Sequence, residues 1–231
     1  ILDDEPDVSL RTLVDAAREG APLVELSAAV AYAAARRPVH FHTSNEFADW
    51  NTVHHTFTYT NAVDQAMRRA PSRDLARGIL DGAMSVYLER FLNVPKQPLP
   101  QQSQPSSNGD APSTDAILAE FDQQQRVDET AQIVADLIAA GQQEQVIETL
   151  GHALLREDAG FHQYQIYEAG LRQYQNFSGR PEGDHILIGM SRFLTAHAPT
   201  VRAVGQTFDI AYRLQRGLAL HEGTLDEETQ S

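Results

Sequence analysis

The stretch from Glu144 to Gln175 places acidic side chains among apolar ones, and this conflict most constrains the fold. Its sequence, EQVIETLGHALLREDAGFHQYQIYEAGLRQYQ, has apolar residues at three- and four-residue steps, which is the spacing of one helix face. Glu157 and Glu168 fall on the same face. A carboxylate on a core-facing stripe is costly unless it is paired or binds a metal ion. We therefore expect one long helix here, with inward carboxylates that need a partner.

Similar apolar spacing along the rest of the chain predicts an all-α protein, a helical bundle of about eight helices. Gly20 and Pro38 are expected to end helices, Ser72 to cap one, and Gln125 to lie near a break in another. No segment has convincing strand-like alternation. The expected helices cover about 7–19, 23–36, 51–69, 72–92, 114–140, 144–175, 184–197 and 199–216.

A segment poor in apolar residues divides the chain. Residues 96–113 read KQPLPQQSQPSSNGDAPS, a composition that predicts a flexible linker. The linker separates a first helical half, 1–95, from a second, 114–218, and an acidic tail, 219–231, follows. We expect the two halves to pack against each other as one domain, because repeated helical units bury their apolar faces together.

The two halves are also similar in sequence. When His55 is aligned with His162, HTFTYTNAVDQAM lies over HQYQIYEAGLRQY, and about 28 residues further on Gly82-Ala-Met-Ser matches Gly189-Met-Ser. The offsets all lie near 105 residues. They predict an internal duplication of a four-helix unit, in which residues 8–95 superpose on 113–199. The alternative is chance similarity between amphipathic helices of like composition.

Composition excludes several classes of site and partner. The chain has no cysteine, which rules out disulfides, thiolate zinc sites and iron–sulfur clusters held by this chain. A net charge of -14 argues against nucleic acid or an anionic membrane as the main partner. No apolar run reaches the roughly 18 residues of a membrane span. With no visible signal peptide, we expect a cytoplasmic protein.

Histidines and glutamates gather at equivalent places in the two halves, and this pattern predicts a metal site. Imidazole with carboxylate and no thiolate suits non-haem iron, manganese or zinc. Taken singly, each histidine is more often a hydrogen-bonded structural residue. Without a metal, the glutamates need arginine partners, of which the nearest in sequence are Arg156 and Arg172. The predicted ligands are His42, Glu46, His55, His152, Glu157, His162 and Glu168.

Three other histidines are given different roles. Neighbouring side chains on a helix point about 100° apart, so we expect His55 and not His54 to face the site. The Glu-x-x-His pair of di-iron bundles occurs once, at Glu182 and His185, beside a glycine at a helix start. His197 lies on an apolar face and is expected to be a satisfied core histidine.

The strings VHHTFTYTNAVDQAMRRAPS, GAMSVYLERFLNVP and LLREDAGFHQYQIYEAGLRQY resemble a bacterial family whose helical region is attached to a Rieske-type ferredoxin domain. The resemblance covers most of the chain outside the linker. It implies a redox setting, in which the helical part serves or receives electrons. Because this chain has no cysteine, the Rieske cluster itself is not in it; the cluster domain would follow Ser231, form a separate subunit or be missing.

Two functions follow from these observations. The first is an oxidoreductase domain with a buried His/Glu non-haem iron centre that reacts with oxygen or a small-molecule substrate. The second is a non-catalytic helical scaffold that docks a Rieske-type ferredoxin domain or another redox protein. In the scaffold, the polar residues of the core would only fix the packing.

Overall fold

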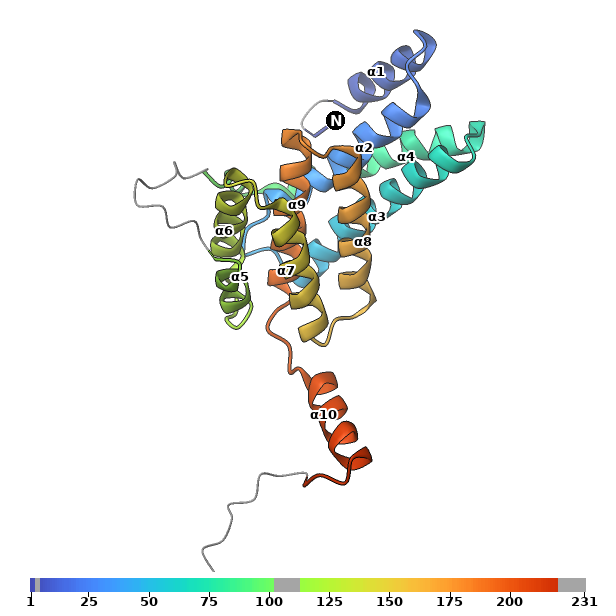
Figure 1. Cartoon of the computed structure of the whole chain (residues 1–231). Coiled ribbons are helices and arrows are strands. Elements are labelled where there is room, and N and C mark those ends of the chain that lie inside the picture. Colours follow the sequence, from blue (N-terminus) through green and yellow to red (C-terminus); the bar gives the residue numbers. More distant parts are fainter. Residues whose placement is uncertain (3–4, 102–112, 220–231) are drawn as a thin grey trace, which may run out of the picture.

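Ten α-helices and one 3-10 helix build the chain in its computed structural model, which describes residues 1–2, 5–101 and 113–219 (Figure 1). No strand occurs in these ranges, so the all-α prediction is confirmed. The elements are α1 (Pro6–Arg18), α2 (Leu23–Val39), α3 (Phe47–Arg69), α4 (Arg73–Leu88), the 3-10 helix η1 (Glu89–Asn93), α5 (Asp115–Glu120), α6 (Val127–Ala139), α7 (Gln143–Arg156), α8 (Phe161–Asn176), α9 (Pro181–Ala196) and α10 (Ala203–Gln215).

Four helices, α2, α3, α8 and α9, form the centre of the bundle (Figure 1). They close a ring in which α2 packs on α3, α3 on α8, α8 on α9 and α9 on α2. Helix α4 covers α2 and α3, and α1 lies against α4. On the other side, α6 and α7 pack on α9, and α5 packs on α6 and α7. One apolar cluster includes residues of both halves, among them Phe41, Val53, Leu150, Ile166 and Phe193.

Glycines allow two of these helices to come close to their neighbours. A Cβ atom on Gly189 of α9 would lie 3.0 Å from a methyl carbon of Val39 and 3.1 Å from the carbonyl oxygen of Ala35, both on α2. On α4, a Cβ atom at Gly82 would lie 2.7 Å from the methyl carbon of Thr60 on α3. Both positions therefore need glycine, and they are the two glycines that the sequence repeat aligns.

The predicted duplication is visible only in part. Helices α3 and α4 pack as a pair in the first half, as α8 and α9 do in the second. Helix α7, however, has no counterpart, because residues 40–46 join α2 to α3 without a helix. Helix α2 packs extensively on α9, and no comparable contact joins the equivalent α4 and α6 in the described ranges. Superposition of the complete halves stays a prediction.

The prediction of one helix from Glu144 to Gln175 is wrong. Helix α7 ends at Arg156, and the backbone is extended at Glu157 (φ -85°, ψ 161°) and at Gly160 (φ -83°, ψ 178°) before α8 begins. The segment contains Asp and Gly, which are poor residues for a helix interior. The break changes the register of the apolar stripe. Phe161, one of the apolar residues at helical spacing in this stretch, is 62% exposed as a result.

The expected linker is not free along its whole length. Residues 96–101 lie along the bundle: the Gln97 N–H donates to the His40 carbonyl oxygen at 3.0 Å, and Gln132 Nε2 donates to the Gln101 carbonyl oxygen at 2.6 Å. Leu99 packs against the main apolar cluster. The prediction for residues 102–112 lies outside the described residues, as does most of the acidic tail.

Helix α10 projects from the bundle (Figure 1). No residue of α10 is buried, and its apolar side chains, which include Phe208 and Leu214, are exposed. Its N-terminus is nevertheless anchored, because the Asp158 carboxylate accepts the N–H groups of Ala203 and Val204 at 2.8 and 2.9 Å. The helix is therefore held at one end only.

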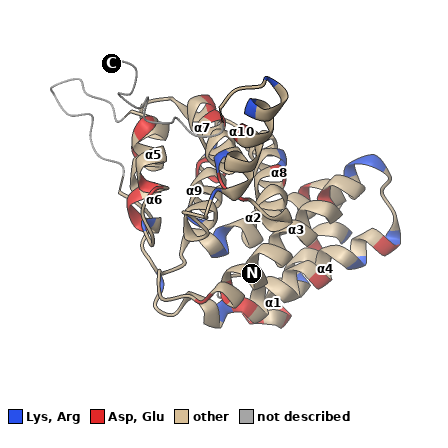
Figure 2. Cartoon of the chain, turned by 90° about the horizontal axis from the view of Figure 1, so that it is seen from below, with Lys and Arg blue, Asp and Glu red and all other residues tan. Residues whose placement is uncertain are grey.

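The acidic residues are spread over several helices, α5 and α6 among them (Figure 2). The charge therefore marks no single face of the described structure as a binding surface. None of the helices in the described ranges has the length and apolar character needed to cross a membrane.

Candidate metal centre

Three histidines meet where α3 packs on α8. One ligand atom from each of His54, His55 and His162 lies within 4.8 Å of the others. The ring centroids form a near-regular triangle, with distances of 5.1 Å between His54 and His55 and 4.9 Å from His162 to each of them. We call these three residues the histidine cluster. It contains two of the seven predicted ligands, His55 and His162.

His54 belongs to the histidine cluster, so the prediction that only His55 of this adjacent pair faces the site was wrong. Its side chain does diverge from that of His55 around α3. His162, however, approaches α3 in the gap between the two rings and is equally far from both. The angle between neighbours on one helix does not fix where the partner helix lies. The adjacent pair of histidines was itself the signal that sequence reasoning passed over.

The histidine cluster runs from the core to the surface. His54 is 0% exposed, His162 is half-buried and His55 is exposed. Both ring nitrogens of His54 and Nδ1 of His162 are buried and have no hydrogen-bond partner in the described residues. Buried polar atoms of native proteins are nearly always hydrogen-bonded, so such atoms need an explanation, such as a bound ion or water. Three in one cluster point to something that the imidazoles bind.

Burial keeps the buried imidazole uncharged. It lowers the pKa of His54 from 6.5 to about 3, and the neighbouring His162 and His55 lower it further, with a partial offset from the backbone of His162. A neutral ring is the form that binds a metal. His54 is thus ready to act as a ligand at any pH near neutrality.

A stack of rings supports the histidine cluster from the side of α9. Phe193 stacks on His54 at 5.2 Å between centroids and on His197 at 4.3 Å. Nδ1 of His197 lies 2.7 Å from the Phe193 carbonyl oxygen. Because a carbonyl oxygen can only accept, Nδ1 carries the proton and Nε2 is left as an acceptor. That Nε2 is buried without a partner in the described part of the chain, so His197 is only half satisfied.

Glu157 lies away from the histidine cluster, and its predicted role as a ligand is not supported by its position. Its carboxylate accepts from Thr200 N and Oγ1 at 2.7 and 2.8 Å and from the Arg202 guanidinium at 2.6 Å. Burial raises the pKa of Glu157, but these hydrogen bonds from Arg202 and Thr200 lower it more, so the carboxyl is ionised. Arg156, the expected partner, is farther away at 3.6 Å. Arg202, distant in sequence, therefore explains why this glutamate is buried.

The other two predicted glutamates also serve local structure. Glu168 is exposed and pairs with Arg172 at 2.8 Å, one turn later on α8. The break before α8 is what turned it away from the core. Glu46 is the exposed N-cap residue of α3, and its N–H donates to the Asp49 carboxylate at 3.0 Å. Both glutamates thus lie outside the histidine cluster.

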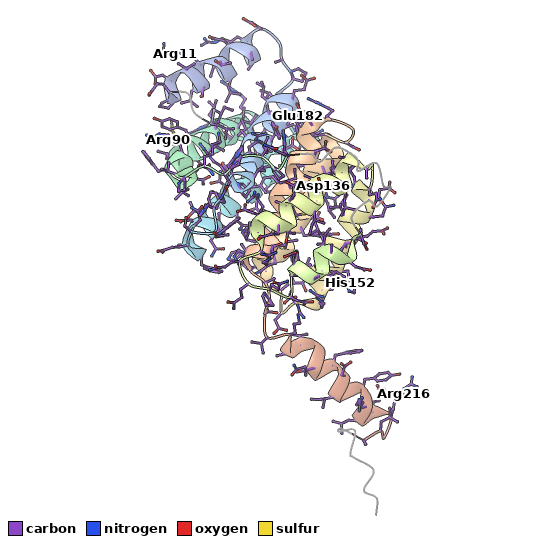
Figure 3. The ribbon with its side chains drawn as sticks, turned by 90° about the vertical axis from the view of Figure 1, so that its left-hand side faces the viewer. Arg11, Arg90, Asp136, His152, Glu182 and Arg216 are labelled. Carbon is purple, nitrogen blue, oxygen red and sulfur yellow. The ribbon has the colours of Figure 1, made fainter. Side chains whose placement is uncertain are left out.

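His42 and His152, also predicted as ligands, are not part of the histidine cluster. His42 lies in the loop before α3, where its Nδ1 is 2.8 Å from Ser44 Oγ and accepts the Ser44 N–H at 3.0 Å. His152 is exposed on α7 and lies at the edge of the molecule in Figure 3. The repeat does not make these two residues equivalent, because His42 lies in a loop and His152 on a helix without a counterpart in the first half.

A second histidine pair is unsuited to a cation. His185 and His40 share the guanidinium of Arg36, whose nitrogens lie 2.9 Å from His185 Nδ1 and 2.8 Å from His40 Nε2. The Tyr32 hydroxyl is also 2.7 Å from His185 Nδ1. Because a positive group already occupies these ring nitrogens, the Glu182–His185 motif does not mark a metal site.

The sequence matches no protein-family profile, no curated protein and no solved structure. The function must therefore be argued from the geometry of the site.

Proposed function

We propose that the chain binds one divalent transition-metal ion through His54, His55 and His162, as the centre of a metal-dependent enzyme of the cytoplasm. The observation that carries this proposal is the meeting of three imidazole ligand atoms within 4.8 Å of one another. The buried ring nitrogens without partners in the described residues support it. A bound ion would give them the partner that they lack.

The donor set supports a catalytic rather than a structural ion. Imidazole suits zinc, iron, copper and nickel. Structural zinc sites are closed by four protein ligands, whereas catalytic sites use three and leave a position open. The histidine cluster offers three donors and reaches the surface at His55. A metal held there would act as a Lewis acid or activate a water molecule.

A non-haem iron oxidoreductase, served by a Rieske-type ferredoxin or another redox protein, is a more specific form of this proposal. The sequence resemblance motivates it. Non-haem iron oxygenases typically use two histidines and one carboxylate. The three glutamates predicted as ligands lie outside the histidine cluster, so the geometry favours metal binding in general over iron in particular.

Titration of EDTA-treated protein without a His-tag, with Co²⁺ and then Zn²⁺, tests the proposal. We expect one equivalent to bind and the free energy of unfolding in urea to rise by about 2.7 kcal/mol at a free metal concentration 100 times the Kd. The visible spectrum of bound Co²⁺ reports its geometry. His162→Ala should abolish the stabilisation and leave the helical content, measured by circular dichroism, nearly unchanged.

His152→Ala is the matched control, because it removes an exposed histidine outside the histidine cluster. It should bind metal as the wild type does. The proposed metal centre is contradicted if metal does not stabilise the wild type, or if His152→Ala loses as much stabilisation as His162→Ala. The histidines then only pack, as the non-catalytic scaffold requires.

A further inference from the structure

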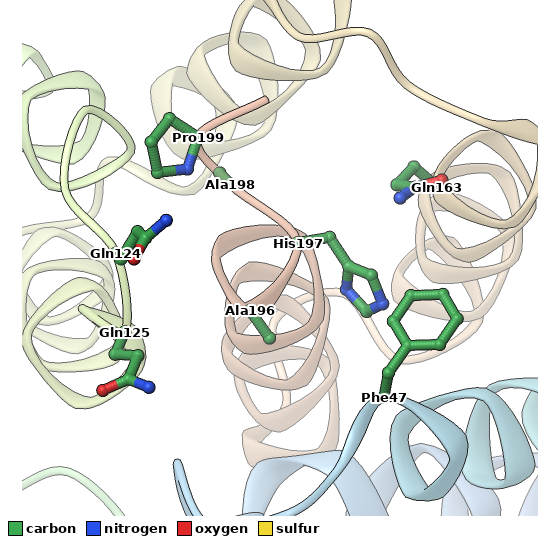
Figure 4. Close-up of a pocket in the computed structure, with 8 residues that line it drawn as sticks. All are labelled: Phe47, Gln124, Gln125, Gln163, Ala196, His197, Ala198 and Pro199. Carbon is green, nitrogen blue, oxygen red and sulfur yellow. The ribbon is translucent and has the colours of Figure 1, made fainter. Parts of the chain in front are cut away.

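A pocket of about 430 Å³ lies beside the ring stack that supports the histidine cluster (Figure 4). Phe47, Gln163 and His197 line one side, and Gln124 and Gln125 line the other. A smaller hollow of about 170 Å³ shares Phe47, Gln125 and His197 and extends to Trp50. The volume of the larger pocket falls in the range of small-molecule sites.

The lining combines apolar surface with neutral hydrogen-bonding groups. Three glutamine amides and His197 supply the polar atoms, and Ala196, Ala198 and Pro199 supply apolar surface. No charged side chain lines either hollow in the described residues. An ionised ligand would lose water here without gaining a charged partner, which is costly. The net charge of -14 disfavours an anion further.

Aromatic groups make the pocket suited to a ring. Phe47 is 64% exposed, and its ring meets the His197 ring edge to face with centroids 5.1 Å apart. Aromatic pairs of this geometry are favourable beyond the area they bury. A ligand ring placed on Phe47 would cover it from water. The amides of the three glutamines that line the pocket can each donate to or accept from a ligand hydroxyl.

We infer that this pocket binds a neutral aromatic molecule bearing a hydroxyl group, such as a phenol or an aryl alcohol. Resting on the proposed function, the inference makes this molecule the substrate class of the metal centre. The pocket and the histidine cluster are joined by short links. His197 stacks on Phe193, which stacks on His54, and Gln163 directly follows His162 in α8.

The single tryptophan of the chain provides the assay. Trp50 is 4% exposed and lines the smaller hollow, so a nitroaromatic ligand bound nearby should quench its fluorescence. The probes are 4-nitrobenzyl alcohol, which is neutral, and 4-nitrobenzoate, which is anionic and of similar size. In metal-free protein, the alcohol should quench saturably. The benzoate should bind at least tenfold more weakly or quench only in proportion to its concentration.

Two variants locate the binding. Phe47→Ala removes an exposed side chain. It should weaken binding of the alcohol at least fivefold without loss of fold. Phe91→Ala, which removes a similarly exposed phenylalanine on η1, should leave the affinity unchanged. Three results would each overturn the inference. They are quenching by the alcohol that never saturates, equal affinity for both probes, and an affinity of Phe47→Ala for the alcohol equal to that of the wild type.

The same titration separates the pocket from the metal. Because it uses EDTA-treated protein, its result does not depend on whether a metal binds. The titration is then repeated with Co²⁺ bound. A change in the Co²⁺ spectrum on adding the alcohol supports a substrate role, whereas an unchanged spectrum with saturable quenching overturns that role and leaves a binding pocket only. If Co²⁺ does not bind at all, the proposed function fails while the pocket stands.

Discussion

Helices α3 and α8 bring together two buried polar clusters that differ in one respect. The first is the histidine cluster. The second, the Asp64 cluster, consists of Asp64, Ser27, Arg68, Gln173 and Asn176 and lies roughly three turns further along α3. In the Asp64 cluster the carboxylate is 0% exposed and accepts from Ser27 Oγ at 2.8 Å and from Arg68, Gln173 and Asn176 at 3.0 Å each. In the histidine cluster the buried nitrogens have no such partners among the described residues.

The difference separates a polar cluster whose carboxylate is hydrogen-bonded within the protein from the cluster for which we propose a metal ion. Both clusters lie between the same two helices, and each contains a residue that is 0% exposed. Burial alone therefore does not distinguish them. The Asp64 cluster joins α2, α3 and α8 through hydrogen bonds and needs nothing else. In the histidine cluster only the His162 backbone lies near the His54 ring, and no hydrogen bond of ordinary geometry reaches the buried nitrogens from the described residues. Accounting for hydrogen bonds, rather than counting buried polar residues, therefore identifies the candidate functional site.

Asp64→Ala should have the largest effect on stability. It removes the acceptor that Ser27, Gln173, Asn176 and Arg68 share, and leaves the first three with only their second acceptors. We expect a loss of about 3–5 kcal/mol in the free energy of unfolding, measured in urea. Asp81→Ala, at an exposed aspartate of α4, is the control and should stay within about 0.5 kcal/mol of wild type. A loss below 1 kcal/mol for Asp64→Ala would remove the contrast between the two clusters.

Glu89→Gln tests a buried group that is only half satisfied. One Glu89 oxygen accepts from the Thr56 hydroxyl of α3, and the other has no partner in the described residues. Burial raises the pKa of Glu89 from 4.5 to about 7, although Thr56 and Arg37 lower it in part.

Between pH 4.5 and 7 the unfolded chain therefore releases a proton that the folded chain keeps, and the wild type loses stability as the pH rises. Glu89→Gln should be more stable than wild type by about 1–3 kcal/mol at pH 8 and nearly equal to it at pH 4. Urea unfolding at the two pH values measures this. An equal effect of Glu89→Gln at both pH values would contradict the assignment.

His54→Leu should have the smallest effect, and its sign depends on pH. The low pKa of His54 means that the folded protein keeps this ring neutral while the unfolded chain takes up a proton below pH 6.5. The wild type thus loses stability as the pH falls from 6.5 toward 3. In EDTA, the free energy of unfolding of His54→Leu, relative to that of the wild type, should be about 1–2 kcal/mol higher at pH 5 than at pH 8. A constant difference for His54→Leu would show that the ring is protonated or solvated in the folded state.

Local features of the fold could be predicted from the sequence because their causes are local. Gly20 and Gly141 end helices and have positive φ angles of 100° and 76°. Ser72 caps α4, where its hydroxyl accepts the Leu75 N–H at 3.2 Å. The break near Gln125, where φ is 62°, was expected as well. Each of these depends on a few neighbouring residues.

What could not be predicted depends on residues far apart in the chain. The break between α7 and α8 is held by Arg202 and by the start of α10, which use Glu157 and Asp158. A helical period carried across that break misplaced Glu168. The site was half predicted: the repeat found His55 and His162, but membership of His54 required knowledge of how α8 approaches α3. The Asp64 cluster was missed because its acceptor and donors come from three helices.

Because no residue of α10 is buried, packing on the bundle contributes little free energy to this helix. A helix of 13 residues is close to the length below which isolated helices are marginal in water, and the Asp158 cap is its main anchor. Heating should therefore unwind α10 gradually before the bundle unfolds in one cooperative step. Circular dichroism would record both events, whereas Trp50 fluorescence would record the second alone. Melting curves from the two probes need not coincide, and for this chain that mismatch would be a helix–coil transition rather than a folding intermediate.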